Sequence, residues 1–282
     1  MSAKYLIFIG ICLTNPTLTN LGMGFQKLAI NRIRAASGGK SKFVLLWILG
    51  LVFQGMVVVL QVKALSIGNA STLGGFAGFG LIPLALFSHF VLKEEISRRE
   101  FAGLGMILTG TAMLGFFSHG HQRGIVEFEQ SRMTVFLIVY ALACAGVVFF
   151  MMRNISVYGG PALGALGGSL GGLGLVALKI VVGRYIGAGS GIVLSNILAD
   201  PYTWLAVLGA LGSVVLVQFG YKYGKAIQVV PGFSSFVVIL PALSGVLVLR
   251  ESLPLICILS LAVIISGVLV TTTANKTPNQ NP

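Results

Sequence analysis

Nine apolar stretches, each close to the length that crosses a lipid bilayer, run through this chain with short polar connections between them. A helix needs about 20 mainly apolar residues to span the hydrocarbon, where every backbone polar group must find a partner inside the protein. Only 9% of the residues are charged, against about a quarter in soluble domains. We therefore predict an all-α, polytopic membrane protein with one transmembrane domain over 1–282. The predicted helices are 5–30, 43–66, 70–92, 100–118, 133–153, 159–183, 201–223, 228–249 and 253–274.

The basic residues predict how the chain is oriented in the membrane. The 19 Lys and Arg residues give a formal net charge of +12 and lie mainly at the ends of the apolar stretches. This placement indicates contact with lipid headgroups and gives no basic face for a nucleic-acid partner. Twelve of them fall on the side of the 31–42 connection and seven on the other. We expect an inner-membrane or plasma-membrane protein with its N-terminus outside and its C-terminus in the cytoplasm, ending in a disordered tail, 275–282.

A short pattern occurs twice at an offset of 157 residues. Leu-Lys-Glu ends at Glu94 and Leu-Arg-Glu ends at Glu251, and a glycine, Gly110 or Gly267, follows each glutamate after 16 residues. Five predicted helices separate the two hairpins, and an odd number inverts the second copy. Inverted repeats are the usual build of a secondary transporter, which moves a solute by alternating access around a site near the bilayer midplane. The predicted repeats are 1–118 with four helices and 133–274 with five.

Asn15-Pro16 lies near the middle of the first predicted helix. Lys4 and the apolar run after it resemble the start of a signal peptide, but the run continues to Ile30, so we expect a membrane helix rather than a removable leader. Proline removes a helix hydrogen bond and strains the residue before it. Two interpretations remain open: a kink that nearby Thr hydroxyls patch, or a break that lines a substrate path.

Polar side chains inside the other helices are the next candidates for a solute site. An amide such as Gln54, Gln61 or Gln218 either bonds a neighbouring helix or faces a polar cavity. Lys179 either snorkels to the headgroups or has a function. We expect the residues that line the substrate path to come from one set: Asn15, Asn20, Gln54, Gln61, Ser71, Thr72, Lys179 and Gln218.

The seven acidic residues all lie outside the depth of the predicted helices. Glu94 and Glu251 stand at hairpin tips, where a carboxylate caps the following helix. Magnesium sites combine one or two carboxylates with waters. The predicted helices instead carry amides, hydroxyls and lysines at depth, which favours a neutral or anionic organic solute, or a hydrated cation that binds weakly. His119 and His121 have no third ligand nearby, so we predict neither a metal site there nor a cofactor.

The repeated hairpin resembles the drug/metabolite transporter superfamily (EamA-like), and within it the NIPA-type magnesium transporters. The resemblance implies a fold of nine helices and, as solute, Mg²⁺ or another divalent cation. The family's Gly-Glu pair in helix two corresponds here to Gly55-Met56, and its Asn falls near Val59. The matching stretches are Ala64-Leu65-Ser66, Ser71-Thr72-Leu73-Gly74, Leu92-Lys93-Glu94 with Gly103, Gly171 to Gly183, and Gln218 to Ala226.

Alternative functions stay open at this point. The chain could export or import a small polar or anionic metabolite, or act as a non-transporting membrane scaffold whose glycine-rich 159–183 helix holds partner helices. An enzyme is the weakest alternative, because no acid–base pair or nucleophile occurs at a useful spacing. The sequence also leaves a homodimer open.

Overall fold

The structure is a computed structural model that describes residues 3–35, 40–67, 73, 75–117, 129–153, 155–187, 194–248 and 254–273. Every regular element within these ranges is a helix, which confirms the all-α prediction. Among the described residues, eight helices are long and apolar enough to cross a membrane. They are α1 (Ala3–Ala35), α2 (Ser41–Ile67), α5 (Arg98–Phe117), α6 (Gln130–Arg153), α7 (Ile155–Val182), α9 (Pro201–Tyr223), α10 (Ala226–Leu247) and α11 (Leu255–Thr273).

The predicted helix 70–92 is described as a 3₁₀ turn, η1 (Ala77–Gly80), that continues into α4 (Leu81–Phe90). This apolar helix is shorter than the eight others, and residues 70–72 and 74 lie outside the described ranges. The connection 184–200 differs from the loop that we expected. It contains a π-helical turn, η2 (Gly183–Gly187), and a short helix, α8 (Leu194–Ala199).

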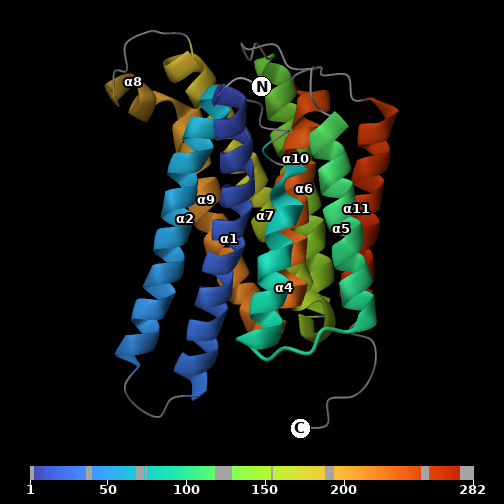
Figure 1. Cartoon of the computed structure of the whole chain (residues 1–282). Helices are drawn as coiled ribbons and strands as arrows, with labels where there is room; N and C mark the ends of the chain where they lie inside the picture. The colour runs from blue at the N-terminus through green and yellow to red at the C-terminus, as the bar shows by residue number, and fades with distance from the viewer. Residues whose placement is uncertain are drawn as a thin grey trace.

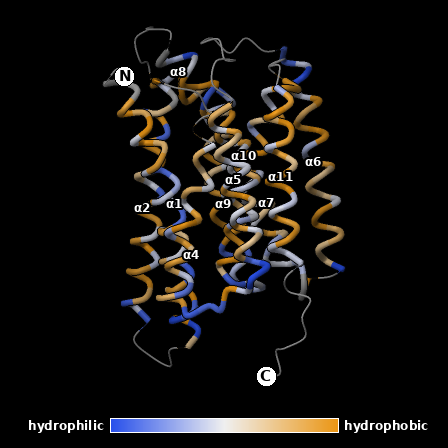
Figure 2. Tube along the Cα trace, turned by 45° about the vertical axis from the view of Figure 1, so that its right-hand side comes forward, coloured by the Kyte–Doolittle hydropathy of each residue, from blue (hydrophilic) through white to orange (hydrophobic). Residues whose placement is uncertain are grey.

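The long helices run side by side as a bundle, with α1 beginning at the upper end and α11 ending at the lower end (Figure 1). α1 packs along α2, α7 packs along α9 and α10, and α5 packs along α11, while α6 contacts α7 and lies at the edge of the bundle in Figure 2. Apolar residues cover the middle of α2, α6 and α11, and polar residues gather near the two ends of the bundle (Figure 2). Large exposed side chains such as Val59 and Leu142 therefore face lipid rather than water.

Glycines let α7 approach two neighbours at backbone distance. A Cβ at Gly164 or Gly168 would collide with a carbonyl oxygen of α10, that of Val229 or Phe233. On the α9 side, a Cβ at Gly174 would lie 3.3 Å from the Cα of Gly209. The glycines of this helix therefore allow close helix packing.

α5 and α11 cross through contacts that come in reciprocal pairs. A Cβ at Gly103 would lie 2.8 Å from the carbonyl oxygen of Gly267, and one at Gly110 would lie 2.9 Å from that of Ser260. Ser260 and Gly267 follow Gly103 and Gly110 by 157 residues, the offset of the repeated hairpin. A contact of residue i with j that is matched by one of j with i is the signature of a twofold relation.

α1 runs without a break through Pro16. The hydroxyls of Thr14, Thr17 and Thr19 each donate to the carbonyl four residues earlier, at 2.8 to 2.9 Å. These bonds give the three hydroxyls partners inside the apolar bundle, but none of the three reaches the carbonyl of Cys12, which Pro16 leaves without its helix donor. The local structure is therefore a continuous helix with its hydroxyls bonded to its own backbone.

Candidate functional site

A cavity of about 460 Å³ lies between α1, α2, α7, α9, α10 and η1. We call it the chamber. Residues 15–23, at the middle of α1, form one wall, so the chamber lies near the mid-depth of the bundle. Most of its surface is Val, Leu, Ala and Gly. The polar lining residues are Asn15, Thr19, Asn20, Gln54, Gln61, Ser213 and Ser234.

The chamber brings together four of the eight predicted lining residues. Asn15 and Asn20 come from α1, and Gln54 and Gln61 from α2. Gln218 and Lys179 lie on the neighbouring α9 and α7 but are not part of its lining. The predicted Ser71 and Thr72 lie outside the described residues. The helix is continuous through Pro16, so the structure shows no break there, and Asn15 and Pro16 line the chamber.

The α1 wall carries buried amides whose nitrogen atoms have no hydrogen-bond partner among the residues that the structure describes. Asn15 is 6% exposed and Asn20 is 1% exposed, and the Nδ2 atoms of both are unpartnered. Ser234 donates to Asn20 Oδ1 at 3.4 Å. Because a buried amide costs free energy unless it is hydrogen-bonded, the Nδ2 atoms of Asn15 and Asn20 favour a polar guest, either water or a solute.

η1 meets α1 at backbone distance beside this wall. A Cβ at Gly80 would collide with the Pro16 carbonyl, so glycine is required there.

A cluster of amides closes the chamber toward the lower end of the bundle. Gln26 Oε1 accepts from Gln54 Nε2 at 3.1 Å and from Gln218 Nε2, and the indole of Trp47 donates to Gln218 Oε1 at 3.3 Å. An indole N–H can only donate, so it fixes which way the Gln218 amide points, and Gln218 in turn fixes Gln26. We call Gln26, Gln54, Gln218 and Trp47 the amide floor. It joins α1, α2 and α9.

Sequence reasoning missed Gln26, which is 0% exposed. The first predicted helix, 5–30, contains Gln26, but this residue was not among the predicted lining residues. α1 continues to Ala35, because Ala and Arg in its last turns are good helix formers, so Gln26 lies well inside the bundle. The spacing of Asn15, Thr19, Met23 and Gln26 would have placed all four on one helix face.

Lys27 lies directly beyond the amide floor. Its Nζ donates to the backbone carbonyls of Tyr221 and Gly224, each at 2.9 Å, and lies 5.3 Å from the centre of the Tyr221 ring. The Tyr221 hydroxyl donates to the carbonyl of Met23 at 3.3 Å. Lys27 is one of the twelve basic residues assigned above to the side of the 31–42 connection, but its side chain is 6% exposed and lies inside the protein rather than among lipid headgroups.

Glu94 caps a different helix from the one expected. Its carboxylate accepts the N–H of Ala226 at 3.0 Å and that of Ile227 at 3.4 Å, at the start of α10. The following helix, α5, begins instead with a reciprocal pair: Ser97 N–H donates to Glu100 Oε2, and Glu100 N–H donates to Ser97 Oγ. The 94–97 connection therefore binds the α9–α10 turn. Glu251, the predicted second cap, lies outside the described residues.

Two further bonds attach the same region to α10. Gln228 Nε2 donates to Glu100 Oε1 at 2.9 Å, and Lys225 Nζ donates to the carbonyl of Glu95 at 3.3 Å. Glu100 is buried, although it stands in the first turn of α5. Polar contacts are thus concentrated at the lower end, between α1 and the 94–100 segment on one side and α9 and α10 on the other.

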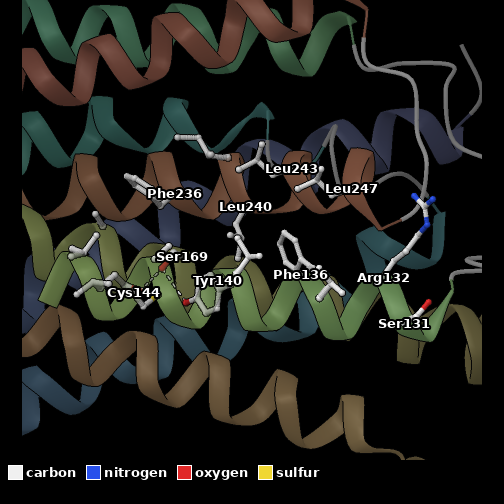
Figure 3. Close-up of a pocket in the computed structure, with 17 residues that line it drawn as sticks. Ser131, Arg132, Phe136, Tyr140, Cys144, Ser169, Phe236, Leu240, Leu243 and Leu247 are labelled. Atoms are coloured by element: carbon white, nitrogen blue, oxygen red, sulfur yellow. Dashed lines mark hydrogen bonds between the residues drawn. The ribbon is translucent and has the colours of Figure 1, made fainter. Parts of the chain in front are cut away.

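A second, larger cavity of about 630 Å³ lies between α6, α7 and α10 (Figure 3). We call it the outer groove. Apolar side chains such as Phe136, Leu240 and Leu243 line most of it, and the hydroxyls of Tyr140 and Ser169 lie 3.1 Å apart within it. Arg132, at one end, pairs with Glu129 at 3.1 Å. This groove suits hydrocarbon, whereas the chamber is better suited to a polar guest.

Asp200 holds the upper corner between α8 and α9. Its Oδ1 accepts the N–H of Tyr202 at 2.9 Å, and its Oδ2 accepts from Arg184 at 2.8 Å. Burial raises the pKa of the Asp200 carboxyl, but the Tyr202 N–H and the Arg184 guanidinium lower it by more, so the pKa falls below its ordinary value. The carboxylate is therefore ionised in the folded protein near neutral pH.

No group of three or more His, Cys, Asp or Glu side chains gathers anywhere in the described ranges. His119 and His121 lie outside those ranges. A cation in the chamber would meet amide and hydroxyl oxygens together with its own waters. Such a site suits a cation that keeps part of its hydration shell.

Comparison with known proteins gives one informative match. The chain is 28% identical over 156 residues to a protein named probable magnesium transporter NIPA9, from Arabidopsis thaliana. The match covers 51% of this chain and 42% of the relative, so the chain spans less than half the length of that curated protein. No family model matches the chain, and no solved structure matches it. With eight membrane-length helices among its described residues, the chain is a multi-pass membrane protein.

Proposed function

We propose that the NIPA-like chain is a secondary transporter that carries a small polar solute through the chamber by alternating access. The observation that carries the proposal is a mid-depth cavity with unpartnered buried amides on the α1 wall. Polar groups at membrane depth are costly and mark solute pathways in membrane proteins. α1 and α2 form one side of the chamber and α7 and α9 the other.

Two inverted repeats, 1–118 and 133–274, would supply the moving halves. The reciprocal contacts of Gly103 and Gly110 with Gly267 and Ser260 support this arrangement, because both pairs use the offset of the repeated hairpin. An inverted pair of halves can rock around a fixed central site and expose it to either side. The basic residues predict that the lower end of the bundle in Figure 1 faces the cytoplasm.

A hydrated divalent cation, Mg²⁺ above all, is the first candidate solute. The name of the Arabidopsis relative supports it, and so does the oxygen chemistry of Gln54, Gln61 and Ser213 in the lining. Mg²⁺ gives up its waters reluctantly and is often held through them. Because the described residues that line the chamber include no carboxylate, we expect weak binding by hydrogen bonds to those waters.

A small neutral or anionic metabolite is the second candidate. The unpartnered Nδ2 atoms of Asn15 and Asn20 favour it, since an N–H group seeks an acceptor such as a carbonyl or carboxylate oxygen. The same missing acid that weakens cation binding would favour an anion. The two candidates therefore make opposite predictions about charge selectivity.

Flux into proteoliposomes tests the proposal. Purified protein is reconstituted with a Mg²⁺-sensitive dye inside the vesicles, and in parallel with labelled sugars, amino acids and organic acids outside. We expect flux of one class and competition within that class only. If correctly folded protein moves none of these solutes, the transporter proposal fails and the scaffold alternative gains support.

A further inference from the structure

We propose that Lys27 is a positioning residue for transport: its ammonium group holds the lower end of the chamber closed, and it must leave the Tyr221 and Gly224 carbonyls before the chamber can open there. The inference rests on the proposed function, in which the chamber is the solute site. Lys27 itself does not line the chamber.

The order of residues along two helices places Lys27 at a closed end. On α1, Asn20 and Met23 line the chamber, Gln26 belongs to the amide floor, and Lys27 follows. On α9, Ser213 lines the chamber, Gln218 belongs to the floor, and Tyr221 accepts from Lys27. Two successive layers of polar contacts thus separate the chamber from the lower end.

The bonds of the second layer connect segments from the two predicted repeats. Lys27, on α1, binds the end of α9, and Glu94, after α4, binds the start of α10. Tyr221 returns a bond from α9 to Met23 of α1. If the halves rock apart at this end, all of these bonds must break together. A set of cross-repeat bonds that is intact in this structure therefore describes a state closed at the lower end.

The chemistry of the Lys27 site suits a bond that breaks and re-forms. The last carbonyls of a helix carry partial negative charge, and the face of an aromatic ring adds to it, so Tyr221 and Gly224 stabilise a cation without neutralising it. The long lysine stem can carry the ammonium group to water when the site opens. A lysine buried among apolar groups alone would instead incur the full cost of desolvation.

Accessibility of a chamber cysteine tests the inference without measuring transport. Cys12, Cys144 and Cys257 are first replaced by Ala, and Ser213→Cys places a single thiol in the chamber lining. A membrane-impermeant thiol reagent is applied from the lower side and, separately, from the upper side of oriented vesicles. K27M removes the charge at similar length, and K27R is the matched control that keeps it.

We expect K27M to raise the rate of labelling from the lower side about tenfold, the effect of losing a charged hydrogen-bonded contact, and to leave labelling from the upper side unchanged or slower. K27R should label at the rate of the parent protein. An unchanged lower-side rate in K27M would overturn the inference. So would equal acceleration from both sides, which indicates general loosening, or K27R behaving like K27M.

A second variant and the form of the readout keep the outcome unambiguous. If K27M does not fold, E94Q weakens the neighbouring cross-repeat bond to α10 and is expected to raise lower-side labelling in the same direction. Unchanged labelling in E94Q would then count against the inference. If K27M opens the lower end but no solute is transported by any variant, the gate stands and the proposed function fails. If the parent protein transports solute and K27M transports it at the same rate with unchanged labelling, the proposed function stands and the gate fails.

Discussion

Single polar atoms decide what the chamber can bind. Thr19 lines the chamber and donates to the carbonyl of Asn15, while Thr109 makes the same kind of bond to Gly105 on an exposed face of α5. T19V and T109V therefore change the same atoms in two environments. We expect T19V to weaken solute binding about five- to tenfold, the value of one hydrogen bond, and T109V to leave it unchanged. Solute-induced thermal stabilisation measures both, and equal effects would contradict a solute site at the chamber.

Asp200 gives stability a pH dependence. Its pKa in the folded protein is lowered, so its contribution is present above the ordinary carboxyl pKa of about 4 and is lost as pH falls through the lower folded value. Asn is as good an N-cap as Asp, so D200N isolates the charge. We expect D200N to unfold at a lower temperature than the parent protein at pH 7, and the difference between the two unfolding temperatures to become smaller toward pH 3. An equal difference at both pH values would mean that the charge contributes nothing.

At the scale of elements, glycine spacing determines how close the helices lie. A Cβ at Gly110 would lie 2.7 Å from Ile264 Cγ1, whereas one at Gly105, on the same helix, would meet nothing within 4 Å. Ala favours helix over Gly by about 1 kcal/mol, so G105A should be neutral or stabilising. G110A must push α5 from α11 and should cost about 1–3 kcal/mol. Thermal unfolding compares the two, and a G110A protein as stable as G105A would contradict the close crossing.

The elements were more predictable than their ends. Long apolar stretches gave the eight membrane-length helices and a helix before residue 92, because hydropathy over 20 residues averages out local detail. The end of α1 was wrong, because basic residues there read as a headgroup flank. Lys27 lay close to the end of the predicted helix 5–30, where a lysine can reach the headgroups, so only the packing of α1 against α9 shows that it is buried. The target of Glu94 was also beyond the sequence, since a cap on α10 from 132 residues away depends on tertiary contacts.

Part of the site was predictable from the sequence, and the rest depended on how the helices pack. Asn15, Asn20, Gln54 and Gln61 line the chamber because a polar group in an apolar stretch needs a polar environment wherever the helix packs. Gln218 satisfies the same need by bonding Gln26 and Trp47, the neighbour-helix alternative that was left open for such amides. Only the packing of α9 against α1 and α2 decides between these two outcomes.

At the scale of the whole molecule, the proposed function places the solute path in the chamber and not in the outer groove. Two exposed alanines provide matched positions: Ala210 of α9 lines the chamber, and Ala143 of α6 lines the outer groove. A phenylalanine at either site adds the same bulk to one cavity and leaves the other untouched. Both variants retain an apolar surface residue, so both should fold.

Solute flux in proteoliposomes, compared among the parent protein, A210F and A143F, is the most direct test of this claim. Thermal unfolding first establishes that the three proteins are folded. We predict that A210F abolishes flux of whichever solute the parent protein carries, while A143F keeps the parent rate. Full flux through A210F, or loss of flux in A143F alone, would contradict a transport path between α1, α2, α7 and α9.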